Sequence, residues 1–147
     1  MVEPPDEDLL IPLGEAEVKR EGSDVTIICY AQTVPLALKA AEKLQEQGVS
    51  CEVIDPRTIR PLDIDTIIAS VKKTNRVVIA EESHPICGVG AEISAEIMER
   101  AFDYLDAPVK RVSGADVPMP YAKNLENLAI PDVDRIVAAV REVAYLG

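Results

Sequence analysis

The chain has 147 residues, 48% of them hydrophobic and 28% charged, which is enough to bury one core and gives no sign of a second domain. Its 26 acidic and 15 basic residues leave a net charge of −11, which argues against non-specific nucleic-acid binding and against docking on an anionic membrane. The same charge suits a basic protein partner.

The sequence shows no export or membrane segment. A bilayer-spanning helix needs about eighteen or more consecutive apolar residues, and no such run occurs. The acidic, proline-bearing start lacks the apolar core of a signal peptide. The three cysteines, Cys29, Cys51 and Cys87, are an odd number in a domain that needs no disulfides. We therefore expect reduced thiols in a cytosol-like compartment.

Residues 1–10 are predicted to be a solvated linker, because MVEPPDED combines prolines and acids without periodicity. One domain is expected over residues 11–147. Residues 15–20 alternate apolar and charged side chains, which is typical of an edge strand protected by its own charges. The β-branched run at residues 25–30 predicts a buried strand.

Helices and strands then alternate. A helix is expected over 33–47, with Thr33 as its N-cap and Gly48 as its stop. Asp63 is the candidate N-cap of the next helix. In the helix after that, Ile93, Ile97 and Met98 are expected to face the core. The remaining predicted elements are strands at 49–55, 77–80 and 109–112 and helices at 63–72, 89–100 and 132–145.

The strand at Val77–Ala80 is apolar without interruption, which indicates the middle of a parallel sheet covered on both faces. The order of the elements predicts an α/β fold with three layers, α/β/α. The loop that follows this strand would lie at the carboxyl end of the sheet, where ligands and partners usually bind in such folds.

Gly88-Val89-Gly90 follows this strand and opens a helix, as phosphate-binding loops do. The third glycine of a G-x-G-x-x-G fingerprint would fall at Ile93, however, and no Walker lysine is present. The two glycines are better explained by close packing between strand and helix. Nucleotide or small-molecule binding remains the alternative.

The same loop contains Ser83, His84 and Cys87, but these residues do not predict a catalytic site. Neighbouring loop residues seldom adopt the geometry of a catalytic triad, and no G-x-S-x-G elbow accompanies them. The cysteines and the single histidine also lack the spacing of a metal site.

Two arginines and two glutamates follow neighbouring strands. Arg57 and Arg60 lie in a loop bounded by prolines, and Glu81 and Glu82 follow the apolar strand. Guanidinium groups and carboxylates pair well, so we expect a structural ion pair, within the chain or between subunits. A substrate-carboxylate site and ordinary solvated charge are the alternatives.

Several of these segments together resemble a known family. They are Ile11-Pro12-Leu13-Gly14, RTIRPLD at 57–63, Glu81-Glu82 followed by GVGAEI at 88–93, Asp106-Ala107-Pro108 and GADVPMPYA at 114–122. The chain is similar, from about Ile11 to its end, to the C-terminal, transketolase-like domain of the beta subunit of the pyruvate dehydrogenase decarboxylating component. The segment SHPIC at 83–87 departs from the family's aromatic-bearing loop.

The resemblance implies a five-stranded, mostly parallel sheet with one antiparallel edge strand, in the order 15–20, 49–55, 25–30, 77–80, 109–112. It also implies that thiamine diphosphate and magnesium bind to an upstream domain, from which residues 1–10 would lead. We expect no cofactor in this domain, which would be inactive alone as part of a complex that converts pyruvate to acetyl-CoA and CO2.

The resemblance further implies assembly partners: an alpha subunit, a second beta subunit and the basic subunit-binding domain of the dihydrolipoyl acyltransferase. The apolar loop after the last strand and the glycine face are the candidates for beta-beta pairing: Gly88, Gly90, Glu92, Val117, Pro118, Met119 and Tyr121. The acyltransferase would dock on Asp106, Tyr145, Leu146 and Gly147. The family implies a bacterial cytoplasm, mitochondrial matrix or plastid. A self-associating scaffold is a further alternative.

Overall fold

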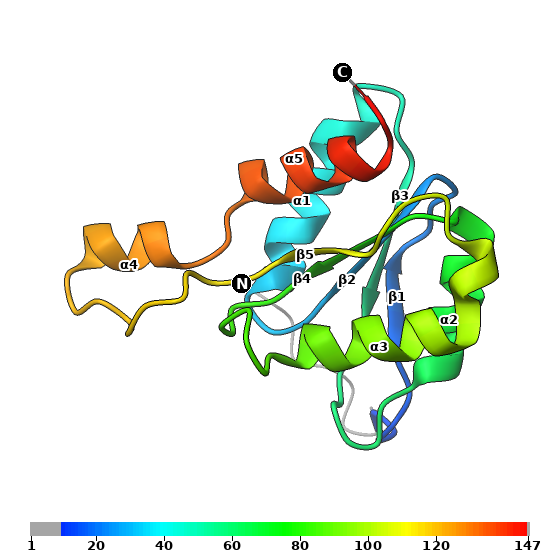
Figure 1. The fold of residues 1–147 in the computed structure, drawn as a ribbon, viewed down its shortest axis with the longest axis horizontal. Helices are drawn as coiled ribbons and strands as arrows, with labels where there is room; N and C mark the ends of the chain where they lie inside the picture. The colour runs from blue at the N-terminus through cyan, green and yellow to red at the C-terminus, as the bar shows by residue number, and fades with distance from the viewer. Residues whose placement is uncertain (1–9, 147) are drawn as a thin grey trace.

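The computed structural model describes residues 10–146, which fold around one five-stranded sheet (Figure 1). The strand order is β1-β3-β2-β4-β5. The strands are β1 at Glu17–Arg20, β2 at Val25–Cys29, β3 at Cys51–Asp55, β4 at Val77–Ala80 and β5 at Lys110–Val112. β1 runs antiparallel to β3, and all other neighbours are parallel. The fold class and the strand order are confirmed.

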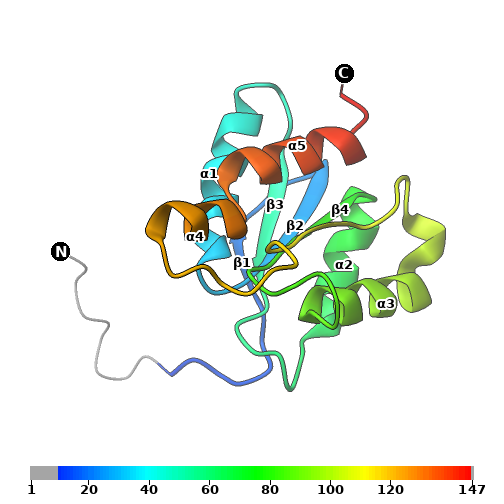
Figure 2. The ribbon, with the colours of Figure 1, turned by 60° about the vertical axis from the view of Figure 1, so that its left-hand side comes forward.

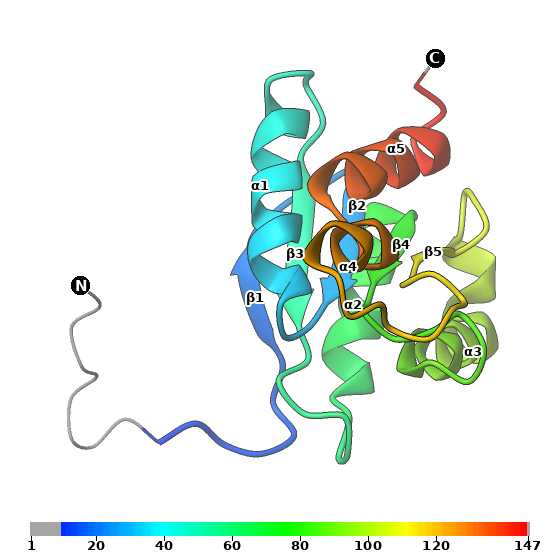
Figure 3. The same ribbon diagram turned by 90° about the vertical axis from the view of Figure 1, so that its left-hand side faces the viewer.

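The helices cover both faces of the sheet, with α1 and α5 on one side and α2 and α3 on the other (Figure 1). A view turned by 90° shows the same three layers (Figure 3). The helices are α1 at Thr33–Gln45, α2 at Ile64–Thr74, α3 at Val89–Ala101, α4 at Lys123–Ala129 and α5 at Val133–Val143; a short 3-10 helix, η1, spans Phe102–Tyr104.

The core is split in two by the sheet because the central strands are apolar on both faces. In β2, Ile27 packs toward α1 and α5, whereas its neighbour Ile28 packs toward α2 and α3. Every residue of β2 and β4 is buried. This two-sided burial produces the uninterrupted apolar runs in the sequence.

The helix ends follow the sequence in part. The Asp63 side chain accepts from the Thr66 amide at 3.1 Å, so the predicted cap of α2 is confirmed. The cap prediction for Thr33 is wrong, because α1 already includes Thr33 and Gln32 precedes it. The Thr33 hydroxyl lies 3.0 Å from the Ala80 carbonyl oxygen and so ties α1 to the central strand.

Two elements differ from the sequence prediction. α4, at Lys123–Ala129, is a helix that is not among the predicted elements. Met98, expected in the core with Ile93 and Ile97, is 44% exposed, because α3 turns only Ile93 and Ile97 of these three toward the sheet. Figure 1 shows α4 standing apart from the sheet, and Figure 2 shows it on the side of α1 and α5.

Candidate functional site

A buried carboxylate organises the loops at the carboxyl end of the sheet. Glu81 directly follows β4 and is 0% exposed. Its Oε2 atom accepts from the Tyr30 hydroxyl at 3.0 Å, the Ser83 hydroxyl at 2.6 Å and the Gly90 amide at 2.8 Å. Its Oε1 atom accepts from the Ser113 hydroxyl at 3.2 Å. One side chain therefore joins the ends of β2, β4 and β5 to the start of α3.

The glycines of the Gly88-Val89-Gly90 segment provide the space for this carboxylate. A Cβ atom at Gly90 would lie 2.5 Å from Glu81 Oε1, and one at Gly88 would lie 2.9 Å from it. The first-turn amides of a helix attract anions, and here the protein's own carboxylate occupies that position. This geometry supports the packing interpretation of the two glycines, because Glu81 already accepts from the Gly90 amide.

Tyr30 is held as a donor in this cluster. Burial, reinforced by the negative charge of Glu81, raises the pKa of its phenol to about 12. The hydroxyl therefore stays protonated at neutral pH and donates to Glu81. Glu81 has only hydroxyl and amide partners here, with no lysine or arginine among its contacts within residues 10–146.

The predicted ion pair does not form within the chain. Arg57 pairs with Glu17, its Nη2 atom lying 2.9 Å from Glu17 Oε2, and among the residues that the structure describes no ion pair joins Arg57 or Arg60 to Glu81 or Glu82. The strand order explains the error, because β2 lies between β3 and β4. The arginine loop follows β3 and therefore faces the edge strand β1. Pairing between subunits stays a prediction.

Ser83 and His84 do not form a catalytic pair. Ser83 donates to Glu81, whereas His84 Nδ1 lies 3.0 Å from the Ala115 carbonyl oxygen. The described part of the chain contains no cluster of three or more histidine, cysteine, aspartate or glutamate side chains that could hold a metal ion. These residues position loops.

The cysteines are free thiols with unequal surroundings. Burial raises the pKa of Cys29 and of Cys51 to about 12, so both stay protonated and unreactive. Cys87 is exposed in the loop before α3.

The candidate pairing surface is a projecting arm. The Ala115 amide donates to the Ala129 carbonyl at 2.7 Å and closes the arm at its neck. We call residues 116–128 the arm. Its large apolar side chains are 46% to 108% exposed: Val117, Met119, Tyr121, Leu125 and Leu128. Pro118 is also exposed. Sequence reasoning missed Leu125 and Leu128, although their helical spacing in KNLENLA was a usable signal.

The glycine face contributes less than predicted to any pairing surface. Gly88 and Gly90 are buried within the chain, whereas Glu92 is exposed. Two of the three residues expected there are therefore covered by the protein itself.

The candidate docking residues meet at the opposite end of the sheet. The Tyr145 hydroxyl donates to the Asp106 carbonyl oxygen at 3.0 Å. The Asp106 carboxylate is 57% exposed and lies 3.4 Å from Arg76 Nη2. Leu146 is 42% exposed at the end of the described chain. Gly147 lies outside the described residues.

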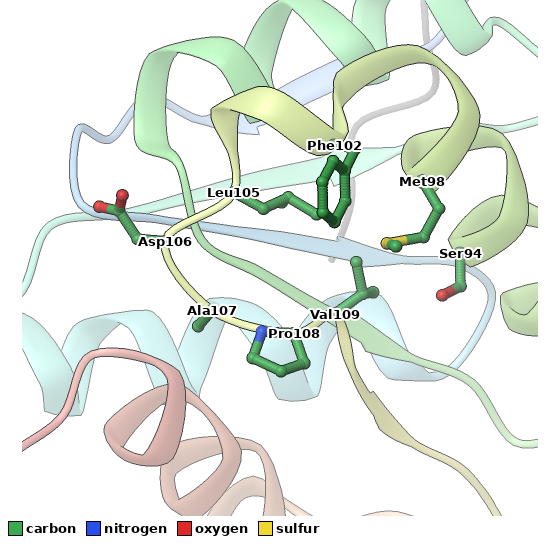
Figure 4. Close-up of a pocket in the computed structure, with 8 residues that line it drawn as sticks. All are labelled: Ser94, Met98, Phe102, Leu105, Asp106, Ala107, Pro108 and Val109. Carbon is green, nitrogen blue, oxygen red and sulfur yellow. The ribbon is translucent and has the colours of Figure 1, made fainter.

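An apolar groove begins beside Asp106 and has a volume of about 430 Å³ (Figure 4). It lies between the second half of α3 and the start of β5. Eight residues line it: Ser94, Met98, Phe102, Leu105, Asp106, Ala107, Pro108 and Val109. The groove was not predicted from the sequence, because it depends on how α3 and β5 pack.

Within residues 10–146, no helix has the length and apolarity needed to cross a membrane.

The family model of the transketolase C-terminal domain matches residues 14–136. Among curated proteins, the mitochondrial pyruvate dehydrogenase E1 component subunit beta-2 of Oryza sativa is 55% identical over 95% of the chain and 37% of its own length. The pyruvate dehydrogenase E1 component subunit beta of Rickettsia felis is 57% identical over 92% of the chain and 41% of its own length. The chain thus spans about two fifths of these relatives.

Solved structures show the same fold. A split-gene transketolase, described as an inactive beta4 tetramer, aligns with a TM-score of 0.81 and 29% identity, over 95% of this chain and 44% of its own. A 2-oxoglutarate:ferredoxin oxidoreductase from Magnetococcus marinus aligns at a TM-score of 0.59 with 16% identity, over 88% of this chain and 19% of its own, which shows the fold alone.

Proposed function

Because the chain belongs to the transketolase C-terminal domain family, we propose that it is the C-terminal assembly domain of a pyruvate dehydrogenase E1 beta subunit. The observation that carries this proposal is identity of 55% and 57% to relatives of that name across more than nine tenths of the chain. The parent complex would convert pyruvate to acetyl-CoA and CO2. This domain would contribute contacts rather than chemistry.

The thiamine diphosphate and magnesium of the parent enzyme would bind upstream of this domain. The residues described here do not fit them, since Glu81 fills the amide site at the start of α3 and no metal-holding cluster occurs in residues 10–146. We therefore expect no pyruvate decarboxylation by the chain alone. Calorimetric titration with thiamine diphosphate, or with common nucleotides, is expected to give no heat of binding. Micromolar affinity would instead favour the small-molecule-binding alternative.

Two contact surfaces follow from this proposal. The arm, with Val117, Pro118, Met119 and Tyr121, would contact a second beta subunit. Glu92 of this chain would contribute to the same pairing surface. The exposed apolar side chains of the arm support this use, because monomeric proteins rarely expose contiguous apolar patches. The alpha subunit would complete the parent heterotetramer.

The second surface would receive the dihydrolipoyl acyltransferase. Asp106, Tyr145 and Leu146 lie together and stay partly exposed, and Gly147 continues this end of the chain. The net charge of −11 favours a basic partner.

The docking proposal is tested by binding the chain to immobilised dihydrolipoyl acyltransferase at two salt concentrations, with Asp106→Ala as the variant. We expect binding that weakens with salt and falls further in the variant. A folded chain that does not bind would refute docking, and a stable dimer that ignores the acyltransferase would favour the scaffold alternative.

The proposed location is a mitochondrial matrix or a bacterial cytoplasm, with a plastid as a further compartment. Relatives of both kinds support it, one named as mitochondrial and one from the bacterium Rickettsia felis.

A further inference from the structure

We propose that the groove beside Asp106 is an anchor site for the docking partner. The partner would place a large apolar side chain in the groove and a lysine or arginine next to Asp106. This inference rests on the docking function proposed above and extends its surface to residues on α3 and η1. It adds Met98 and Phe102 to the candidate contacts.

The groove has the character of an anchor site. Phe102 is 62% exposed and Met98 is 44% exposed, although both are large and apolar. Figure 4 shows these two side chains with Val109 around one concavity, whereas Asp106 lies beyond Leu105 with its carboxylate pointing away from them. The groove volume of about 430 Å³ lies within the range of roughly 300–1,000 Å³ that is typical of ligand pockets. Interface hot spots are commonly anchored side chains in pockets of this kind.

The charges near the groove favour a basic partner. Three of the neighbouring cations are paired within the chain: Arg76 with Asp106, Arg100 with Glu96 at 2.7 Å, and Lys110 with Glu142 at 2.7 Å. A fourth, Lys72, lies 4.9 Å from the centroid of the Tyr104 ring.

The neighbouring carboxylates are not paired in the same way. Glu99 and Asp103 follow Met98 and Phe102 directly in the sequence and are exposed. Neither forms an ion pair within residues 10–146. These two carboxylates outnumber Lys72, so the uncompensated charge beside the groove is negative, although Asp106 itself is paired with Arg76. A second copy of this acidic chain would be repelled there, whereas a cation next to an apolar anchor would be attracted.

The groove is continuous with the docking residues. Tyr145 reaches Asp106 through its hydroxyl, and Asp106 lines the groove itself. A partner that contacts Asp106 and the end of α5 would therefore also cover the groove. The apolar and charged contacts belong to one surface.

The test compares variants of the 147-residue chain for binding to immobilised dihydrolipoyl acyltransferase at two salt concentrations. Phe102→Ala and Met98→Ala remove groove side chains, and Asp106→Ala removes the charge. Ile86→Ala is the matched control, because Ile86 is 70% exposed and lies in the loop after β4, away from the groove and outside the arm. Circular dichroism verifies that each variant is folded, and light scattering gives its oligomeric state.

We expect each groove variant to raise Kd about tenfold at both salt concentrations, since an apolar contact is not screened. Asp106→Ala should flatten the salt dependence, and Ile86→Ala should bind as the unaltered chain does. Groove variants that bind normally while Asp106→Ala weakens would overturn the anchor site and leave docking intact. Absence of binding by the unaltered chain would overturn docking and the anchor site together. If light scattering shows a dimer that Phe102→Ala dissociates, the groove belongs to a second copy, which also overturns the inference.

Discussion

The hydroxyl of Tyr145 donates to the carbonyl oxygen of Asp106 at 3.0 Å, although the two residues are 39 positions apart. This hydrogen bond ties the end of the chain to the turn before β5. The family resemblance implies a docking role for both residues, and the fold brings them together.

Tyr145→Phe is expected to change the free energy of unfolding by less than about 1 kcal/mol, because Tyr145 is 69% exposed and such hydrogen bonds contribute little. Binding to the acyltransferase should weaken several-fold, since the end of the chain is no longer held beside Asp106. Urea unfolding and a binding titration measure the two effects. Unchanged binding would show that the hydrogen bond does not position the docking surface.

Glu81→Ala should destabilise the protein by about 3 kcal/mol or more, because it leaves several buried donors without an acceptor. Glu81→Gln should also destabilise it, since an amide nitrogen cannot accept from these donors. Urea unfolding gives both values. Glu82→Gln is the matched control, as Glu82 is adjacent and only half-buried. A cost for Glu81→Gln as small as that of the control would contradict the role of the carboxylate.

Gly90→Ala tests the packing at Gly90 through the sign of the change in stability. In an ordinary helix this change stabilises by roughly 0.5–1 kcal/mol. Here the new Cβ would lie 2.5 Å from Glu81 Oε1 and 3.1 Å from Ile79 Cγ2, so we expect a loss of stability. Thermal unfolding distinguishes the two signs. A raised Tm would mean that the start of α3 can move away from Glu81.

Lys73→Met should destabilise the fold by about 1–3 kcal/mol at neutral pH, because Glu52 is buried and loses its ion-pair partner. Burial raises the pKa of the Glu52 carboxyl group. The hydrogen bonds that this group accepts, of which the one from Lys73 has the largest effect, lower the pKa by more, so it falls below the ordinary 4.5. The hydrogen bond to Glu52 raises the pKa of Lys73 above its ordinary 10.5.

These directions set the pH range of the effect. The stabilisation by Glu52 is present above pH 4.5 and is lost as the pH falls through the lowered pKa of Glu52. The stabilisation by Lys73 is present below pH 10.5 and is lost as the pH rises through the raised pKa of Lys73. The stability difference between the variant and the unaltered chain should therefore be largest between these limits. A difference that does not depend on pH would contradict the ion pair.

Tyr121→Ser should leave the stability nearly unchanged, since the Tyr121 side chain is fully exposed. If the arm pairs two copies, the same change should shift the chain toward monomer. Sedimentation velocity over a range of concentrations measures this shift. Ile86→Ser serves as the control, as Ile86 is 70% exposed and lies outside the arm. Identical sedimentation of variant and unaltered chain would remove Tyr121 from the pairing surface.

Much of the fold was predictable because the sequence is locally consistent. The apolar runs of β2 and β4 indicated a sheet covered on both faces, and the Asp63 cap fixed the start of α2. Met98 was placed wrongly because the apolar stripe of α3 is narrow, and the sheet accommodates only one row of its side chains.

The candidate sites were less predictable, because they depend on the order of strands and on loop packing. Arg57 follows β3 and Glu81 follows β4, so both lie where strands end on the same side of the sheet. Only the strand order reveals that β2 lies between these two strands. No periodicity in the sequence indicates that Glu81 is buried among hydroxyl groups. The groove beside Asp106 likewise exists only where α3 and β5 meet.

Because its neck is closed, the arm can change in sequence independently of the sheet. The hydrogen bond between Ala115 and Ala129, with Ala129 buried, fixes where the arm leaves the domain, whatever lies between. Insertions, deletions and substitutions in residues 116–128 would then alter the outer surface without disturbing the sheet, because loop closure depends only weakly on length. Related domains could exchange one assembly for another by changes in these thirteen residues, while the packing of the sheet beneath is retained.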